Sequence, residues 1–297
     1  MVTALPNEGV KHAPTLGKVM WLELKKDKLA LVAFFLFFLI VTVSFVWGAM
    51  FTPDDYIRVN LFQMDAAPAP GLPLGADPGG RDMIPMLVVG ARNSFVIAFS
   101  VSLISSTIAL MIGLFAGFYG GHVDNMVMRV IDFFAMTPTI MVIIVLIAVM
   151  PHYTPVTFAL IMTLFNWVGA ARNIRLKALQ QGVMDYVAAS KTLGTPNLVI
   201  IFREVFPNVI SFVVVQITLL TASNMGLEIG LSFLGFGLPT GYPSLGILIS
   251  HARNAAVFQS RLWQWLPAAL LIFVMCLCIN YVGQVLNRAA DVKRRTV

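Results

Sequence analysis

The chain has 297 residues, of which 58% are hydrophobic and only 11% are charged, and its formal net charge is +6. Soluble domains carry about 25% charged residues, so this composition excludes an ordinary soluble protein and indicates an all-α membrane protein. A helix needs about 20 mostly apolar residues to cross the hydrocarbon core of a bilayer. Six runs meet that requirement and are expected to be transmembrane helices: 29–51, 94–119, 131–150, 153–171, 206–227 and 263–286.

Residues 1–28 are expected to form a cytoplasmic tail and an interfacial helix. Apolar side chains recur at helical spacing from Leu16 to Leu24, with lysines among them, a pattern typical of a helix that lies in the membrane interface. A frayed tail is the alternative. The run 29–51 has no small-residue cleavage site behind it, so we interpret it as a retained transmembrane helix.

Residues 52–93 are predicted to form an external segment, because its aspartates, prolines and glycines favour turns. Residues 94–297 are predicted to form the core domain with the other five spans. In the second span, Gly113 and Gly117 make a small-xxx-small face that lets another helix approach closely. This helix is therefore expected to lie inside the bundle, although the pattern alone has low specificity.

The basic residues predict which side of the membrane each segment occupies. Lys and Arg are concentrated in cytoplasmic loops. Six spans with both termini in the cytoplasm would place 15 of the 20 basic residues on that side. The positive net charge is therefore explained by topology and needs no nucleic-acid partner.

No catalytic or metal-ligating group is expected. The four histidines are scattered, Cys276 and Cys278 point in different directions on one helix, and no Gly-x-x-x-x-Gly-Lys phosphate loop is present. Ionisable residues are rare in the spans: Asp132 is expected to pair with Arg129 across one helical turn, and Glu228 is placed at the outer end of the fifth span. Without carboxylates near the midplane, an ion-coupled carrier is disfavoured.

The longest predicted cytoplasmic segment, 172–205, is the most informative part of the sequence. It contains a short helix that begins near Asp185, a break at Gly194 and a second helix that enters the membrane through Pro207. The thirteen-residue spacing from Gly194 to Pro207 resembles the EAA loop of ABC importer permeases, in which a Glu-Ala-Ala triplet precedes the glycine. The triplet departs from that pattern because its acidic position is alanine, and Asp185 is the nearest substitute. It reads Ala188, Ala189 and Ser190.

Further stretches, in collinear order between about residues 21 and 288, resemble the second permease of peptide and nickel ABC importers. They are 28–30 with 52–54, 74–77 with 80–82 and 90–94, 119–121 with 124, 128–129 and 132, and 231–237 with 243–246 and 265–267.

This resemblance implies a type I ABC importer permease fold that pairs with a homologous permease as a heterodimer. It implies two ATPase subunits inside, which bind ATP and Mg, and an extracytoplasmic peptide-binding receptor outside. It also implies a multi-pass location in the inner or plasma membrane of a prokaryote, in contact with lipids. By the same resemblance, this chain is no enzyme and binds no cofactor itself.

Three groups of functional residues follow from the resemblance. The ATPase-coupling residues are Asp185, Ala188, Ala189, Ser190, Gly194, Pro207 and Asn208. The external loop that meets the receptor or the pathway mouth contains Leu231, Ser232, Phe233, Leu234, Gly235, Gly237 and Pro243. Candidates for the pathway, with hydrogen bonding between helices as the alternative role, are Gln216, Ser223, Asn224 and Asn280.

A short peptide is the expected cargo, and this chain is expected to form half of its pathway. Nickel or another small solute carried by the same machine is the alternative, which a metal-binding receptor on another chain would indicate. A passive channel or a scaffold is a different class, and it would have no ATPase partner.

Overall fold

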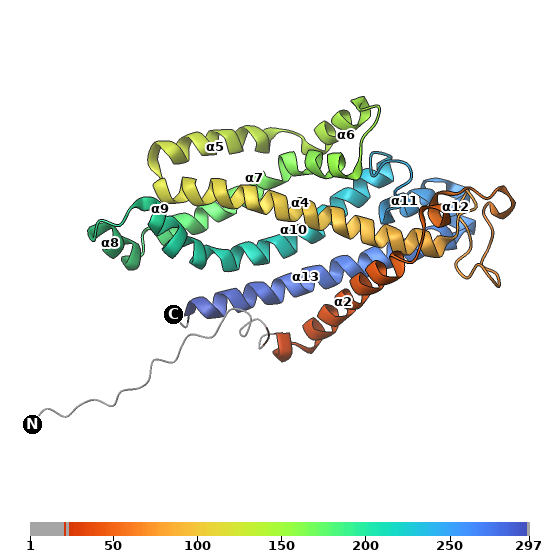
Figure 1. Ribbon diagram of the computed structural model, residues 1–297, viewed down its shortest axis with the longest axis horizontal. Helices are drawn as coiled ribbons and strands as arrows, with labels where there is room; N and C mark the ends of the chain where they lie inside the picture. Colours follow the sequence, from red (N-terminus) through yellow and green to blue (C-terminus); the bar gives the residue numbers. More distant parts are fainter. Residues whose placement is uncertain (1–20, 22–23, 296–297) are drawn as a thin grey trace, which may run out of the picture.

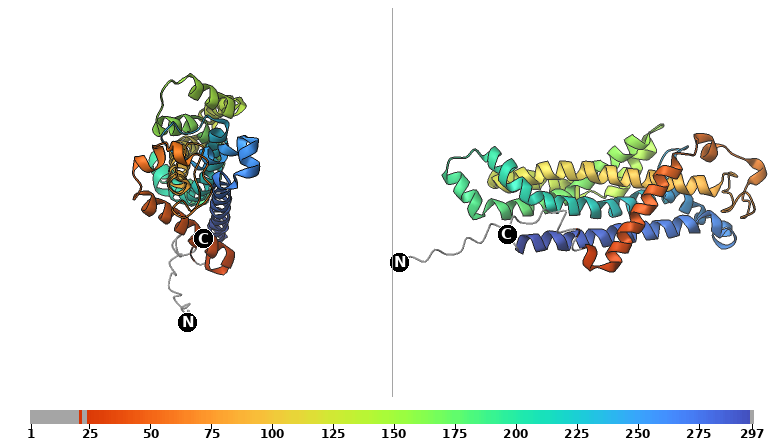
Figure 2. Two further views of the ribbon diagram at one scale, coloured as in Figure 1. Left: turned by 90° about the vertical axis from the view of Figure 1, so that its right-hand side faces the viewer. Right: turned by 60° about the horizontal axis from the view of Figure 1, so that its bottom comes forward.

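The computed structural model describes Trp21 and residues 24–295 (Figure 1). Long helices lie side by side in an elongated bundle, and the described residues include two isolated β-bridges but no longer strand. The long helices are α2 (Lys28–Gly48), α4 (Met83–Tyr119), α5 (Gly121–Met136), α6 (Thr139–Val149), α7 (Pro155–Gly182), α10 (Phe206–Leu234) and α13 (Leu266–Arg295). Helix α2 crosses the others obliquely (Figure 2).

Short elements gather at the two ends of the bundle. One end, which we call the α8 end, contains α8 (Asp185–Thr192), α9 (Asn197–Ile200) and the π turn η2 (Ile201–Val205). The other, which we call the α11 end, contains α3 (Pro53–Ile57), η1 (Leu61–Gln63), α11 (Leu245–Ser250), η3 (His251–Arg253), α12 (Ala255–Ser260) and η4 (Leu262–Gln264). Helices α4 and α10 run along the bundle between these two ends (Figure 1).

Within the described residues, four helical stretches are long and apolar enough to cross a membrane. They are Lys28–Gly48, Met83–Tyr119, Asn197–Leu234 and Leu266–Ala289. The consecutive helices α5 and α6 make a fifth if they are counted as one span. The chain is thus a multi-pass membrane protein; the count of six spans, which also requires α7, stays a prediction. The expected interfacial helix falls largely on 1–20, 22 and 23, outside the described residues.

The third predicted span, 131–150, is wrong as a single straight helix. Helix α5 begins earlier, at Gly121, and its axis is bent by 72° from that of α6. Pro138 lies in the break between them. Proline has no N–H to donate and disfavours helical geometry in the residue before it, so a helix cannot continue straight through Thr137.

Several predicted boundaries differ from the helices observed. Helix α4 begins at Met83, where the carboxylate of Asp82 accepts a 2.8 Å hydrogen bond from the Ile84 N–H, so the helix starts inside the segment 52–93 that is predicted to be external. Helix α7 continues to Gly182, into the segment predicted as a cytoplasmic loop, and α2 ends at Gly48 instead of residue 51. Hydropathy marks residues at hydrocarbon depth, whereas a helix ends where its backbone is capped or broken.

Helices α4 and α7 pack closely through Gly113 and Gly117, which confirms that the second predicted span lies inside the bundle. A Cβ on Gly113 would lie 2.7 Å from the Ala171 carbonyl oxygen. A Cβ on Gly117 would lie 2.6 Å from both the Ala178 Cβ and the Arg175 carbonyl oxygen. Since neither position has room for a side chain, the two helix backbones touch along this face.

Two ion pairs join α5 to α7, and one of them replaces a predicted contact. Asp132 pairs with Arg172 of α7 at 2.9 Å, so the expected pair with Arg129 is wrong. Asp124 accepts two hydrogen bonds from the guanidinium of Arg175. Arg172 and Arg175 are three residues apart, so both lie on one face of α7, where α5 brings the two aspartates to them. Of the two pairs, Asp124–Arg175 is bidentate and therefore the stronger.

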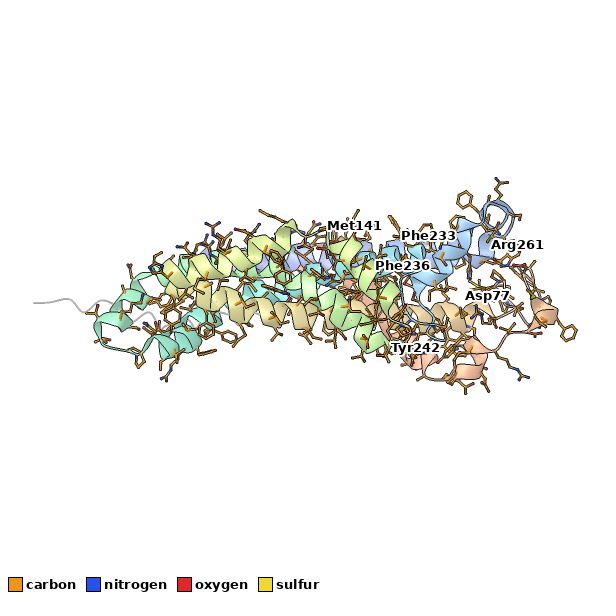
Figure 3. All side chains as sticks on the ribbon, turned by 90° about the horizontal axis from the view of Figure 1, so that it is seen from above. Asp77, Met141, Phe233, Phe236, Tyr242 and Arg261 are labelled. Carbon is orange, nitrogen blue, oxygen red and sulfur yellow. The ribbon has the colours of Figure 1, made fainter. Side chains whose placement is uncertain are left out.

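The α11 end is ordered by a buried carboxylate. Asp77 is fully buried, and its Oδ1 accepts hydrogen bonds of 2.8 Å from the backbone N–H groups of Gly79 and Arg81. The Gln264 amide of η4 donates to Asp65 Oδ1 at 2.8 Å and so links η4 to the segment between α2 and α4. Figure 3 shows Asp77 and Arg261 at this same end of the molecule.

Candidate functional site

Helix α8 and the turn after it form the predicted coupling segment. Gly194 has φ +77°, in the left-handed region, and its N–H donates to the Lys191 carbonyl oxygen. The Thr195 N–H donates to the Ser190 carbonyl oxygen at 3.1 Å. Glycine adopts this conformation without steric cost, so it ends α8 and turns the chain toward α9.

The chain then forms α9, η2 and α10 without a break. At the π turn, the Phe206 N–H donates to the carbonyl oxygen of Ile201, five residues earlier. Pro207 follows immediately and has no N–H for the carbonyl of the preceding turn. A π turn at this point shifts the hydrogen-bond register and lets a helix continue past a proline.

Side chains of α8 contact the base of α10 at two levels. The Ser190 hydroxyl donates to Glu204 Oε1 at 2.5 Å, and the Asn208 amide donates to the Tyr186 hydroxyl oxygen at 3.4 Å. The Tyr186 hydroxyl donates in turn to Gln181 Oε1 at 2.7 Å. Burial raises the pKa of the Tyr186 phenol, so this hydroxyl keeps its proton at neutral pH.

One apolar and one cationic contact complete the attachment of α8. Val187 is fully buried in a cluster that includes Phe118 of α4 and Ile174 of α7. The Lys191 ammonium lies over the Phe118 ring, 5.0 Å from its centroid. These contacts hold one side of α8 against the bundle.

The outer side of α8 is open. Asp185, Ala188, Ala189 and Gly194 are exposed, and the apolar side chains of Leu193 and Val183 are 84% and 81% exposed. Other exposed apolar residues nearby are Met184, Leu198, Val199 and Phe202. Clustered apolar exposure of this kind is typical of surfaces that contact another protein or the membrane.

At the α11 end, the predicted external loop is divided between two environments. Leu231, Ser232, Gly237 and Pro243 are buried, whereas Leu234 and Gly235 are exposed and Phe233 is half-buried. The four residues Leu231–Leu234 belong to helix α10 and not to a loop. Figure 3 shows Phe233 and Phe236 close to one another and Tyr242 on the other side of this region.

The segment after α10 folds back onto Ser232. A Cβ on Gly237 would lie 1.8 Å from the Ser232 hydroxyl oxygen, and a Cβ on Gly246 would lie 2.5 Å from the Ser232 Cβ. The Tyr153 hydroxyl donates to the Gly237 carbonyl oxygen at 2.6 Å. Only glycine fits at these two positions, so the glycine-rich sequence specifies a tight seat around Ser232.

Glu228, which we expected at the outer end of a span, lies in the last turns of α10 and belongs to the same seat. It is fully buried, and its Oε1 accepts a 2.7 Å hydrogen bond from the Ser232 hydroxyl. Ser244, at the start of α11, donates to the Ser232 oxygen at 3.3 Å. The four-residue spacing of Glu228 and Ser232 indicates that the two side chains share one helix face. Their burial, however, depends on the chain that folds over them.

The polar pathway candidates occupy different environments. Asn224 is buried and donates to the Ser102 hydroxyl oxygen of α4 at 2.8 Å, which is a contact between helices. Asn280 is exposed and donates to the Cys276 carbonyl of its own helix at 2.9 Å. Ser223 is exposed and Gln216 is half-buried. Asn224 therefore fits the packing role that was the alternative, while the role of the others stays a prediction.

Two residues of the coupling region were missed in the sequence. Tyr186 and Glu204 had no assigned role, yet each supplies one partner of a hydrogen bond that joins α8 to η2 or α10. The signal was the four-residue spacing of Tyr186 from Ser190 and of Glu204 from Asn208, which places each pair on one helix face.

Comparisons with known proteins agree with this architecture. The family model described as "Binding-protein-dependent transport system inner membrane component" matches residues 109–292. The "Oligopeptide transport system permease protein OppC" of Lactococcus lactis subsp. cremoris is 40% identical over 289 residues, covering 96% of this chain and 98% of that protein. The protein of the same name from Bacillus subtilis is 31% identical and covers 96% of this chain and 92% of its own length. The "Dipeptide transport system permease protein DppC" of Bacillus subtilis is 32% identical over 276 residues, covering 93% and 85%.

Proposed function

This chain belongs to the family of binding-protein-dependent transport system inner membrane components, and from that membership we propose how it takes part in peptide uptake. It is a permease subunit of a peptide ABC importer. We propose that it forms half of the translocation pathway and that a homologous permease forms the other half. The ends of its helices would face the cytoplasm at the α8 end and the outside at the α11 end.

The observation that carries this proposal is the exposed surface of α8. Its small residues, Ala188 and Ala189, let a partner surface approach closely, and Leu193 supplies an apolar contact. An ATPase subunit would bind there and supply ATP and Mg, since this chain has no phosphate-binding loop. For ATP to drive transport, the ATPase must contact α8 differently in its two states.

The remaining parts of the assembly follow from the same reasoning. We propose six spans with both termini in the cytoplasm of a prokaryote, because that topology leaves most basic residues inside. α7 would serve as the fourth span. A second ATPase subunit would bind the partner permease, and an extracytoplasmic receptor would dock at the α11 end. This chain would bind no cofactor and perform no catalysis itself.

Peptide cargo is favoured over nickel by the named functions of the relatives. Both the oligopeptide and the dipeptide permeases are similar to this chain over more than 90% of its length. Uptake of a labelled short peptide and of nickel, measured in cells with and without this chain, separates the two cargoes. Loss of nickel uptake alone would contradict the peptide assignment.

The test of the machine is co-purification in mild detergent. Wild type should bring down a second permease and ATPase subunits, whereas Ala189→Asp should keep the permease and lose the ATPases, because the charge faces the docking surface. The matched control is Ala256→Asp, which changes another exposed alanine, in α12 at the opposite end. Wild type that purifies without any ATPase would instead support a passive channel or a scaffold.

A further inference from the structure

We propose that Glu204 is a positioning residue that fixes the coupling helix α8 to the base of α10, so that movement of α8 is passed directly into α10. The inference rests on the proposed function, because it concerns how the ATPase movement enters this chain. Glu204 lies in the π turn η2, immediately before α10.

The contacts between the two helices form an antiparallel ladder of two rungs. Ser190 donates to Glu204 at 2.5 Å in one rung, and Asn208 donates to Tyr186 at 3.4 Å in the other. The two α8 residues are four apart, and so are their two partners, so each pair lies on one helix face. Asn208 also donates to the Glu204 carbonyl oxygen at 2.8 Å, which joins the two rungs.

The Glu204 rung is the stronger of the two. A hydroxyl that donates to a carboxylate makes a charge-assisted bond, which is roughly twice as strong as a neutral one. The second carboxylate oxygen of Glu204 is buried and has no hydrogen-bond partner in the described part of the chain. The Ser190 hydroxyl is therefore the group that satisfies this carboxylate, and loss of it leaves a buried acceptor unpaired.

Helix α8 has few other attachments that could take over this role. Within α8, Val187 is the buried residue, and Lys191 contacts Phe118 of α4. The Lys191 contact leads to α4, whereas the cluster around Val187 also includes Val205 of η2 and Val209 of α10. The apolar contact thus holds α8 near the base of α10, and the two rungs add directional bonds that fix α8 in one position against it.

Helix α10 connects the region of α8 to the α11 end of the bundle. The helical stretch Asn197–Leu234 has 38 residues, about 57 Å at 1.5 Å per residue. It begins next to α8 and ends at the buried Glu228–Ser232 seat that holds the folded-back segment of the α11 end. A displacement applied at Glu204 thus acts on the element that shapes the opposite end of the pathway.

The experiment uses the complete importer with its receptor in proteoliposomes and measures ATP hydrolysis and peptide uptake together. Glu204→Ala and Ser190→Ala should each keep co-purifying ATPases but lower the peptide imported per ATP hydrolysed by roughly five- to tenfold. The double variant should be no worse than either single one, since both remove the same bond. Glu204→Gln, which retains an acceptor oxygen for Ser190, should stay within about twofold of wild type.

Two results would overturn the proposal. One is an unchanged ratio of uptake to hydrolysis in both alanine variants. The other is loss of the ATPases from both variants, which would make the bond part of ATPase docking. If Glu204→Ala purifies poorly, Ser190→Ala still tests the proposal. It removes the same hydrogen bond through a residue of α8, a helix that is mostly exposed. Wild type with no ATPase and no ATP-dependent uptake would refute the proposed function itself, so the two failures are distinguishable.

Discussion

The Ser232 hydroxyl donates to the fully buried carboxyl of Glu228 at a distance of 2.7 Å, one turn earlier in α10. The other Glu228 oxygen is also buried and has no hydrogen-bond partner among the described residues. Ser232 also accepts a hydrogen bond from Ser244 and packs against Gly237 and Gly246, so this pair links α10 to the segment that returns to the bundle.

Glu228→Leu should destabilise the chain by about 1–3 kcal/mol, because the Ser232 hydroxyl loses its acceptor in a buried site. Glu228→Gln should lower the melting temperature much less, since it keeps an acceptor oxygen. Thermal unfolding of the purified chain in detergent measures both. Equal melting temperatures for Glu228→Leu and wild type would mean that the hydrogen bond contributes nothing.

Gly117→Ala should cost about 1–3 kcal/mol because its Cβ would overlap the Ala178 Cβ and the Arg175 carbonyl of α7. Gly169→Ala is the matched control within a helix, since a Cβ there meets nothing within 4 Å. It should be neutral or stabilising by about 0.5–1 kcal/mol. Melting temperatures compare the two, and an equal loss in both would exclude close helix contact as the cause.

Asp124→Asn should destabilise more than Asp132→Asn. The side chains of Asp124 and Arg175 are 12% and 19% exposed, whereas those of Asp132 and Arg172 are 43% and 44% exposed. Breaking the more buried pair leaves a charge unpaired and costs about 3 kcal/mol, while the exposed pair is worth about 0–1 kcal/mol. Denaturation of the two variants under the same conditions shows which one is less stable. A lower stability of Asp132→Asn would contradict the burial argument.

Leu193→Ser should weaken binding of the ATPase subunits without lowering the melting temperature of the chain. Leu193 packs against little of its own chain, being 84% exposed, so its removal costs the fold almost nothing. Phe62→Ser is the control, because Phe62 is a fully exposed apolar residue at the opposite end. Retention of ATPases on an affinity column should fall for the first variant only; a similar fall in both would indicate a nonspecific effect.

The stabilising effect of Asp27 should disappear in acid. This carboxylate accepts a hydrogen bond from the Ala30 N–H at the start of α2 and bonds with Tyr281 and Arg288 of α13. The hydrogen bond from Ala30, followed by those from Arg288 and Tyr281, lowers the pKa of Asp27 in the folded state. A lowered pKa means that the stabilisation is present above the ordinary pKa and is lost as the pH falls through the folded-state value.

The measurement is the melting temperature of wild type and Asp27→Asn as a function of pH. The difference between them should be constant at neutral pH and shrink toward zero as the pH falls below the ordinary range for aspartate. A difference that does not change with pH would show that the charge of Asp27 plays no part in joining α2 to α13.

The features that could be predicted from the sequence are those encoded locally. Apolar runs identify membrane helices because the bilayer core demands about 20 apolar residues in succession. The spacing of Gly194 and Pro207 indicates the coupling segment, since these residues act on their own backbone. The family could be predicted as well, because its motifs are short local stretches that occur in the same order along the sequence.

Contacts between distant residues were decided by the tertiary structure alone. Asp132 lies three residues from Arg129, yet it pairs with Arg172, forty residues away, because α5 and α7 bring them together. Glu204 and Ser190 meet only because α8 folds back on the base of α10. The burial of Glu228 and the division of the external loop likewise depend on which surfaces the packed helices cover. The sequence by itself therefore determined the class of protein and the place of the short helix α8 that is predicted to couple to the ATPase, while three-dimensional packing decided which polar side chains hold the helices in position.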